Sequence, residues 1–223
     1  MSENSRGAML RAGARPAPPS MQPAKPPADE TQRLAALLSL DVLDSAPEAE
    51  FDALVRAASL ACGAPISLIS LIDSQRQWFK ANIGLPGITE TPRDLAFCAH
   101  AVLDDALFEV ADARLDPRFA DKPLVSGQPD IRFDAGAPVR LSDGHRVGTL
   151  CVIDTQPRQL QPQQREILRC LAQVAAQALE NRRNKPTPAA THTAPRHPGP
   201  SAVRGHPGHA AFHRWPGLPA GRQ

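Results

Sequence analysis

Cys98 and His100 are the residues whose types and spacing most directly suggest chemistry in this chain. They are two positions apart, so on an extended strand their side chains would share one face and offer two ligands to a metal ion. Two ligands are too few, and the other candidates are a single His145 beside an expected turn and an isolated Cys151. We therefore predict no metal site and interpret these side chains as packed thiols and a hydrogen-bonded imidazole.

Three arginines, Arg93, Arg118 and Arg132, stand among proline or apolar neighbours. A buried guanidinium needs a carboxylate or another anion, because an unpaired cation in a protein interior is costly. We predict that these arginines either form internal ion pairs or anchor an anionic ligand. The candidate carboxylates are Asp112, Asp116 and Asp154.

Other catalytic arrangements are not indicated. Ser70 and Ser126 lack the Gly-x-Ser-x-Gly turn of a hydrolase nucleophile, and the chain has no Gly-rich phosphate loop followed by Lys and Ser or Thr. The scattered aspartates mostly fall at expected turns, where a carboxylate accepts hydrogen bonds from backbone amides. No catalytic residue is predicted.

Charge and composition narrow the class of protein. Residues 1–28 have a net charge of +3 and residues 184–223 one of +5, so the formal total of +2 leaves residues 29–183 at −6. An acidic folded segment gives no reason to expect nucleic acid as a partner. We also expect a cytoplasmic protein without a membrane segment, because no run approaches the roughly 18 apolar residues of a span and no signal peptide is recognisable.

The hydrophobic pattern predicts two helices followed by a hairpin. A short amphipathic helix is expected from Glu30, and Ser45 with Glu48 reads as a capping box that starts a second helix, which Gly63 would end. Residues 66–72 and 77–82 then flank a polar turn and predict a hairpin whose first strand is covered on both faces.

A second hairpin and a long helix are expected in the second half of the segment. Residues 138–141 and 146–153 flank Ser142, Asp143 and Gly144, a strong turn signal. Residues 95–103 predict a helix or irregular crossover, and residues 108–111 a short strand. The last helix should run to about Arg183, and its wide apolar stripe suits either a core helix or a two-helix seam with a second subunit.

Several motifs resemble those of the GAF domain family, the sensor modules of bacterial signalling proteins. The match covers roughly residues 29–183 in the family's order and spacing, and its most specific parts are residues 97–100, 132–138 and 148–154. The resemblance implies an α/β (α+β) fold of GAF/PAS type, a central antiparallel sheet of about six strands with helices packed on it. It also implies a sensor that binds a small ligand or senses redox. Members of the family are commonly joined to cyclases, kinases or phosphodiesterases, but no motif of such an output enzyme is found beside the matched segment.

The resemblance also implies where a ligand would bind. In the family a cavity lies between the sheet and the helices and loops that cross it. The predicted ligand-binding residues are therefore Phe97, Cys98, Arg132, Phe133 and Cys151. One departure stands out, because family sequences of this branch usually have Tyr after the Arg-Phe pair and this chain has Asp134. An unusual ligand, or loss of ligand binding, would follow.

From these observations we predict a non-catalytic cytoplasmic sensor that forms a homodimer through its terminal helix and signals to a separate output protein. The cofactor is unknown. Two alternatives remain: a thiol enzyme acting on free methionine sulfoxide through Cys98 and Cys151, as certain GAF proteins do, and a purely dimerising adaptor. Residues 1–28, rich in Pro, and residues 184–223, rich in Pro, His and Arg, are expected to be disordered tails.

Overall fold

The computed structural model describes residues 23–184, which contain every predicted helix and strand. Of the two expected tails, the structure describes residues 23–28, which adopt no helix or strand, and Asn184, which is the last residue of the terminal helix. The rest of both tails lies outside the described residues. The elements in chain order are α1 (Glu30–Ser39), α2 (Ala49–Cys62), β1 (Ile66–Ile72), β2 (Arg76–Ile83), β3 (Glu90–Pro92), a 3-10 turn η1 (Arg93–Leu95), α3 (Cys98–Ala101), β4 (Phe108–Val110), α4 (Pro123–Ser126), β5 (Phe133–Arg140), β6 (Arg146–Asp154) and α5 (Pro162–Asn184).

The six strands form one antiparallel sheet with the order β3-β2-β1-β6-β5-β4. Both predicted hairpins are confirmed, as β1 with β2 and β5 with β6, and the mixed α/β fold with a six-stranded antiparallel sheet is the one expected. All seven residues of β1 are buried, as a central strand covered on both faces requires. The sheet therefore separates two buried layers.

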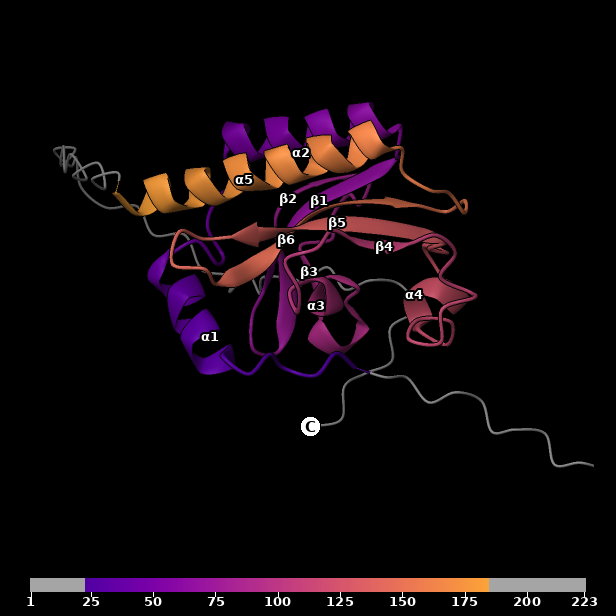
Figure 1. Ribbon diagram of the computed structural model, residues 1–223, viewed down its shortest axis with the longest axis horizontal. Coiled ribbons are helices and arrows are strands. Elements are labelled where there is room, and N and C mark those ends of the chain that lie inside the picture. Colours follow the sequence, from indigo (N-terminus) through magenta and orange to yellow (C-terminus); the bar gives the residue numbers. More distant parts are fainter. Residues whose placement is uncertain (1–22, 185–223) are drawn as a thin grey trace, which may run out of the picture.

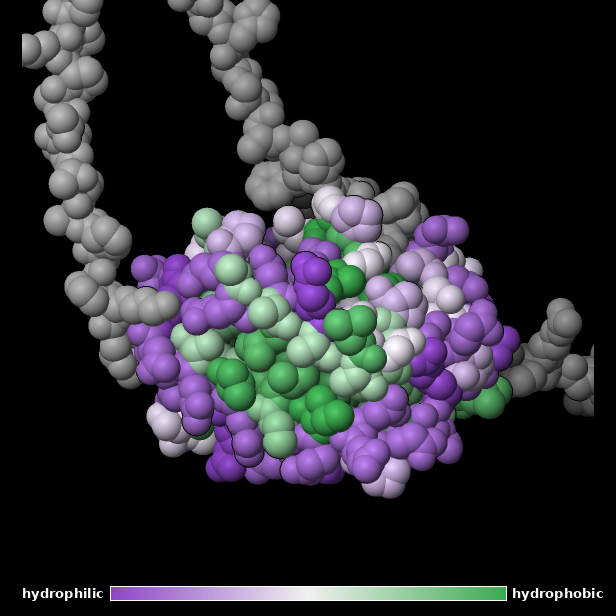
Figure 2. Space-filling model, turned by 90° about the horizontal axis from the view of Figure 1, so that it is seen from above, coloured by the Kyte–Doolittle hydropathy of each residue, from purple (hydrophilic) through white to green (hydrophobic). Residues whose placement is uncertain are grey.

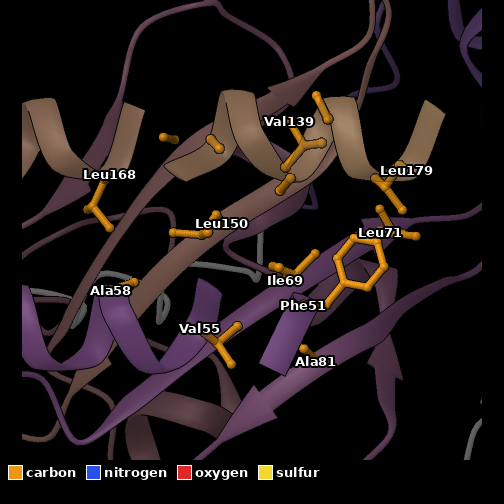
Figure 3. Packing of buried hydrophobic residues seen from close by; sticks show 14 of the residues in the cluster. Phe51, Val55, Ala58, Ile69, Leu71, Ala81, Val139, Leu150, Leu168 and Leu179 are labelled. Atoms are coloured by element: carbon orange, nitrogen blue, oxygen red, sulfur yellow. The ribbon is translucent and has the colours of Figure 1, made fainter. Parts of the chain in front are cut away.

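Helices α2 and α5 lie side by side on one face of the sheet (Figure 1). Phe51 and Val55 of α2 and Leu168 and Leu179 of α5 are fully buried against the strands, because residues spaced three or four apart share one side of a helix (Figure 3). Gly63 ends α2 in the left-handed conformation with φ of 60°, as predicted. We call this layer the helix-side core.

The predicted capping box at the start of α2 is wrong. Glu48 is the N-cap residue, yet no side chain caps this helix end. The side chains of Ser45 and Glu48 instead accept hydrogen bonds from Lys80 Nζ on β2, at 2.9 and 2.6 Å. A buried ammonium needs such acceptors, and this long-range demand overrides the local capping pattern.

Candidate functional site

The opposite face of the sheet is covered by α3, α4 and the loops around them (Figure 1), and its buried residues form a second cluster, the loop-side core. Alternate residues of the strands point into this layer, so β6 contributes Cys151 and Ile153 here while Leu150 and Val152 belong to the helix-side core. A cavity of about 30 Å³ lies in the loop-side core. Its lining residues are Leu68, Gln77, Phe79, Leu85, Thr91, Ala96, Phe97, Cys98, Leu124, Ile131, Asp134 and Ile153.

Two buried thiols meet beside this cavity. Cys98 begins α3 and Cys151 lies in β6, and their Sγ atoms are 3.7 Å apart although 53 positions separate them in the chain. Gln77 Nε2 on β2 donates to Cys98 Sγ at 3.5 Å. The hydrogen bond with Cys151 first, and then those with the Ser70 and Thr149 hydroxyls and Gln77, outweigh burial and hold the pKa of Cys98 below its usual range.

The pKa of Cys151 shifts in the opposite direction to that of Cys98. Its pKa is raised well above that of an ordinary thiol, because the hydrogen bond that it shares with Cys98 and its full burial beside Cys98 and Asp134 favour the protonated form. The two sulfurs therefore differ in character. Cys98 is the one that favours the thiolate, and Cys151 stays protonated.

Asp134 is a buried carboxyl group in the cavity wall. Its residue is 1% exposed, and neither carboxyl oxygen has a hydrogen-bond partner among the described residues. Burial, and to a lesser extent the neighbouring Cys98, raises the pKa of Asp134 well above its ordinary value. The group is therefore a neutral acid with unused donor and acceptor capacity facing the cavity.

The five predicted ligand-binding residues are only partly brought together. Phe97 and Cys98 line the cavity, and the Phe97 ring stacks on Phe119 at 4.1 Å between ring centroids. Cys151 is not part of the lining, but its sulfur contacts that of Cys98. Arg132 Nη1 donates to the carbonyl of Val125 at 2.8 Å, outside the lining. Phe133 points into the helix-side core, because it precedes Asp134 on β5 and successive residues face opposite sides.

The arginines mainly hold the structure together. Arg118 pairs with Asp116, one of the predicted carboxylates, at 2.6 Å. Arg93 pairs with Glu30, and Arg132 pairs with Asp130, so their partners differ from those predicted. Each of these guanidiniums therefore already has an anion within the chain.

Sequence reasoning missed Gln77, Ser70 and Thr149 as members of the thiol cluster. A usable signal was present, because Ser70 and Thr149 are hydroxyl residues inside apolar strands, where a buried polar group requires a partner. They find it in each other, at 3.1 Å between hydroxyl oxygens, and beside Cys98. The pairing of β1 with β6 that joins them is not visible in the local sequence.

The remaining surface offers weaker sites. A groove of about 540 Å³ runs past Asp44, Trp78 and Lys80, but the Lys80 ammonium is already bound to Ser45, Ala46 and Glu48. Among residues 23–184, no three His, Cys, Asp or Glu side chains gather as a metal site would require. Within the same residues no helix has the length and apolarity needed to cross a bilayer.

Comparison with known families and proteins gives matches of two kinds. The family model described as GAF domain matches residues 46–179. A cyclic di-GMP phosphodiesterase of Pseudomonas aeruginosa is 50% identical over 132 residues, which are 59% of this chain and 22% of that protein. The chain thus spans about a fifth of the length of this curated relative.

Solved structures with the same fold include two at low sequence identity. A GAF domain of an Acinetobacter phosphoenolpyruvate-protein phosphotransferase superposes with a TM-score of 0.54 at 18% identity, covering 72% of this chain and 98% of that one. The free methionine-R-sulfoxide reductase of Neisseria meningitidis gives a TM-score of 0.51 at 18% identity, covering 74% and 98%. These likenesses establish the fold.

The prediction that the chain is not an enzyme is contradicted by the Pseudomonas aeruginosa relative, which is named as a phosphodiesterase. The prediction rested on the absence of motifs typical of an output domain from these 223 residues. Such motifs can only be sought in the sequence in hand, and the matching region is a small part of the relative. The missing motifs therefore do not exclude enzymatic activity.

Proposed function

The chain belongs to the GAF domain family, and we propose that it is a sensor module whose loop-side cavity receives a small polar or redox-active molecule. The observation that supports this most directly is Asp134. A buried carboxyl group without a hydrogen-bond partner among the described residues is costly, and a bound molecule that pairs with it would remove that cost.

The size of the cavity limits the ligand. A volume of about 30 Å³ corresponds to roughly two water-sized positions, since one water needs about 10–15 Å³ of such space. A cyclic dinucleotide does not fit unless the covering loops move apart. We therefore propose that the ligand is a small molecule held between Asp134, Cys98 and Gln77.

A chain of contacts leads from the cavity to the terminal helix. Gln77 in the cavity wall belongs to β2, and Lys80 three residues later donates to Glu48 Oε1 at 2.6 Å. The same carboxylate oxygen accepts from Arg182 Nε of α5 at 2.7 Å. A shift of β2 on ligand binding would therefore change the anchoring of α5, which is the route that we propose for the signal.

The outer face of the helix layer suits a second copy of the chain. Figure 2 looks onto this layer and shows a hydrophobic patch framed by hydrophilic residues. Leu60 of α2 is 77% exposed, and Ile167 and Val174 of α5 are 39% and 48% exposed. Contiguous exposed apolar surface favours association, so we propose a homodimer in which α5 packs against its counterpart.

The identity to the Pseudomonas aeruginosa protein suggests what the sensor regulates. We propose that the signal adjusts a cyclic di-GMP phosphodiesterase activity, either in the same polypeptide or in an output protein that contacts α5. Cyclic di-GMP would then be the substrate of that activity, and the loop-side cavity would hold a different and smaller molecule.

A thiol-dependent reduction of free methionine sulfoxide is the second candidate, favoured by the 3.7 Å approach of the Cys98 and Cys151 sulfurs. The small volume of the cavity disfavours this activity, because free methionine sulfoxide is much larger than two water molecules. A turnover assay separates the two. Reduction of free methionine sulfoxide by the wild-type chain, lost in Cys98→Ser, would support the enzyme.

The sensor proposal is tested by filling the cavity. Ala96 lies in the cavity wall and is 2% exposed, so Ala96→Val places apolar volume where the ligand would bind. Thermal unfolding of the full chain is measured with a panel of small polar and redox-active molecules. We expect at least one to raise the Tm of the wild type and not that of Ala96→Val, because a ligand that binds only the native state stabilises it.

The matched control is Ala57→Val, the same substitution at an exposed position of α2. It should retain the ligand-induced rise in Tm. Equal rises in the Ala96→Val and wild-type proteins would place the binding site elsewhere and refute the proposal.

A further inference from the structure

We propose that Cys98, Cys151 and Asp134 form a peroxide-reactive dithiol, in which Cys98 attacks hydrogen peroxide, Asp134 supplies a proton and Cys151 closes a disulfide. This inference rests on the proposed function, because it names the signal molecule for the same cavity.

The Sγ atoms of Cys98 and Cys151 lie close together but do not form a disulfide bond. They are 3.7 Å apart in the reduced protein, and a disulfide requires about 2.05 Å, so they must approach by roughly 1.6 Å. Gly136 on β5 lies opposite Cys151 on β6, and a Cβ added there would meet Cys151 Cβ at 3.2 Å. The missing side chain leaves Cys151 room on this side.

The surroundings assign different roles to the two thiols. Cys98 Sγ accepts a hydrogen bond from Gln77 Nε2 and shares one with Cys151 Sγ at 3.7 Å, with the Ser70 and Thr149 hydroxyls beside it. Such donors stabilise a thiolate, which is the nucleophilic form of cysteine. Once Cys98 is a thiolate it can only accept the hydrogen bond between the two sulfurs, so Cys151 then donates it and stays protonated until Cys98 has been oxidised.

The cavity selects the oxidant by size. It offers roughly two water-sized positions, which matches the two oxygen atoms of hydrogen peroxide. Its wall contains Cys98, Gln77 and Asp134 among apolar residues, so an oxidant there meets the sulfur and the carboxyl group together. Bulky organic hydroperoxides would be excluded.

The first step is balanced by these groups alone. The Cys98 thiolate attacks one peroxide oxygen, the S–O bond forms and the O–O bond breaks. The leaving oxygen takes a proton from Asp134 and departs as water. The products are the Cys98 sulfenic acid, water and the Asp134 carboxylate, with sulfur oxidised by two electrons and peroxide reduced by two.

In the second step the Cys151 thiol reacts with the Cys98 sulfenic acid. The Asp134 carboxylate accepts the thiol proton of Cys151, and the resulting thiolate attacks Cys98 Sγ. The S–S bond forms while the S–O bond breaks, and the hydroxide leaves as water after receiving the proton back from Asp134. The sum is one thiolate, one thiol, one peroxide and one proton from Asp134, giving one disulfide and two waters. Solvent then restores the proton to Asp134.

The test uses the full chain, reduced and then exposed to hydrogen peroxide for increasing times. Thiols are alkylated in denaturant and the peptides are analysed by mass spectrometry. The chain has four cysteines, and Cys62 and Cys170 serve as internal references, one buried and one exposed. We expect loss of two thiols, a Cys98–Cys151 disulfide peptide, and recovery of both thiols with dithiothreitol.

Three variants test the assigned roles. Cys151→Ser should accumulate a Cys98 sulfenic acid that dimedone traps, and Cys98→Ser should leave Cys151 unmodified. Asp134→Asn keeps the shape of the side chain without its proton and should slow oxidation of Cys98 about a hundredfold, the scale of general acid catalysis. Oxidation of Cys62 or Cys170 before Cys98, or an unchanged rate in Asp134→Asn, would overturn the proposal.

Hydrogen exchange of α5 separates this proposal from the sensor function. A disulfide that forms without altering exchange in α5 would support the dithiol and refute the relay. A wild-type chain that forms no disulfide, but gains Tm from another small molecule, would refute the dithiol and support the sensor.

Discussion

Replacing Asp134 by Asn should change how the stability of this domain depends on pH. The folded state keeps a proton on Asp134 because burial raises its pKa, whereas the unfolded chain releases that proton above about its ordinary value of 3.8. Between these two values the folded state binds more protons, so the free energy of unfolding falls as pH rises. The Asn variant has no such proton and lacks this decline.

The size of the effect follows from linkage. A difference of one bound proton changes the free energy of unfolding by about 1.4 kcal/mol per pH unit, so from pH 4 to pH 6 the wild type should lose up to about 3 kcal/mol relative to Asp134→Asn. Urea unfolding at pH 4, 5 and 6 gives the free energies by linear extrapolation. Asp143→Asn, at the exposed hairpin turn, controls for replacing a carboxylate by an amide outside the core.

Parallel stability curves for the wild type and Asp134→Asn over this range would refute the reasoning. They would mean that Asp134 ionises equally easily in the folded and unfolded states. The carboxylate would then be compensated inside the fold, and neither the unpaired acid in the cavity nor its role as a proton donor would stand.

Three further predictions concern other parts of the fold. Glu48→Gln should lower the free energy of unfolding by about 2 kcal/mol in urea titrations, because the buried Lys80 ammonium loses its charged acceptor, and an unchanged midpoint would contradict this. Ile167→Glu should convert the proposed homodimer to a monomer in light-scattering measurements, while a wild type that is already monomeric would disprove the α5 interface. Burial lowers the pKa of Lys122 to about 8 from 10.5, so the unfolded state binds more protons between these values and stability should rise with pH there, by up to about 1.4 kcal/mol per unit. Lys122→Met should lack that rise, and chemical unfolding at pH 8, 9 and 10 measures it.

The hairpins and long helices were predictable because their signals are local. Asp143 and Gly144 favour the turn between β5 and β6 through their own backbone preferences, and Gly63 marks the end of α2 in the same way. Strand β3 and helix α4 were missed, since they have three and four residues and exist through contacts made elsewhere in the fold. The equally short β4 was predicted correctly at residues 108–111, so short elements are recognised only where the local sequence favours them.

The site was harder to predict because its members meet through tertiary structure. The sequence indicated that Cys151 lies in a buried strand, but not that its sulfur approaches Cys98. Phe133 was predicted to line the cavity, but Asp134 does so instead. Strand alternation places one of these two residues in each core, and the strand register that decides which one depends on the pairing with β6. Glu30, the partner of Arg93, lies 63 positions away, beyond any local pattern.

The division of buried residues by the sheet also affects how the domain can diversify. Cys98, Cys151, Gln77 and Asp134 gather on the side of the sheet that the loops cover, while the side that holds α2 and α5 is packed mainly with aliphatic and aromatic groups. Because neighbouring strand positions alternate between the two sides, a substitution such as Tyr to Asp at position 134 alters the chemistry under the loops and leaves the opposite packing untouched. Residues under the loops can therefore change while the packing of α2 and α5 against the sheet is kept.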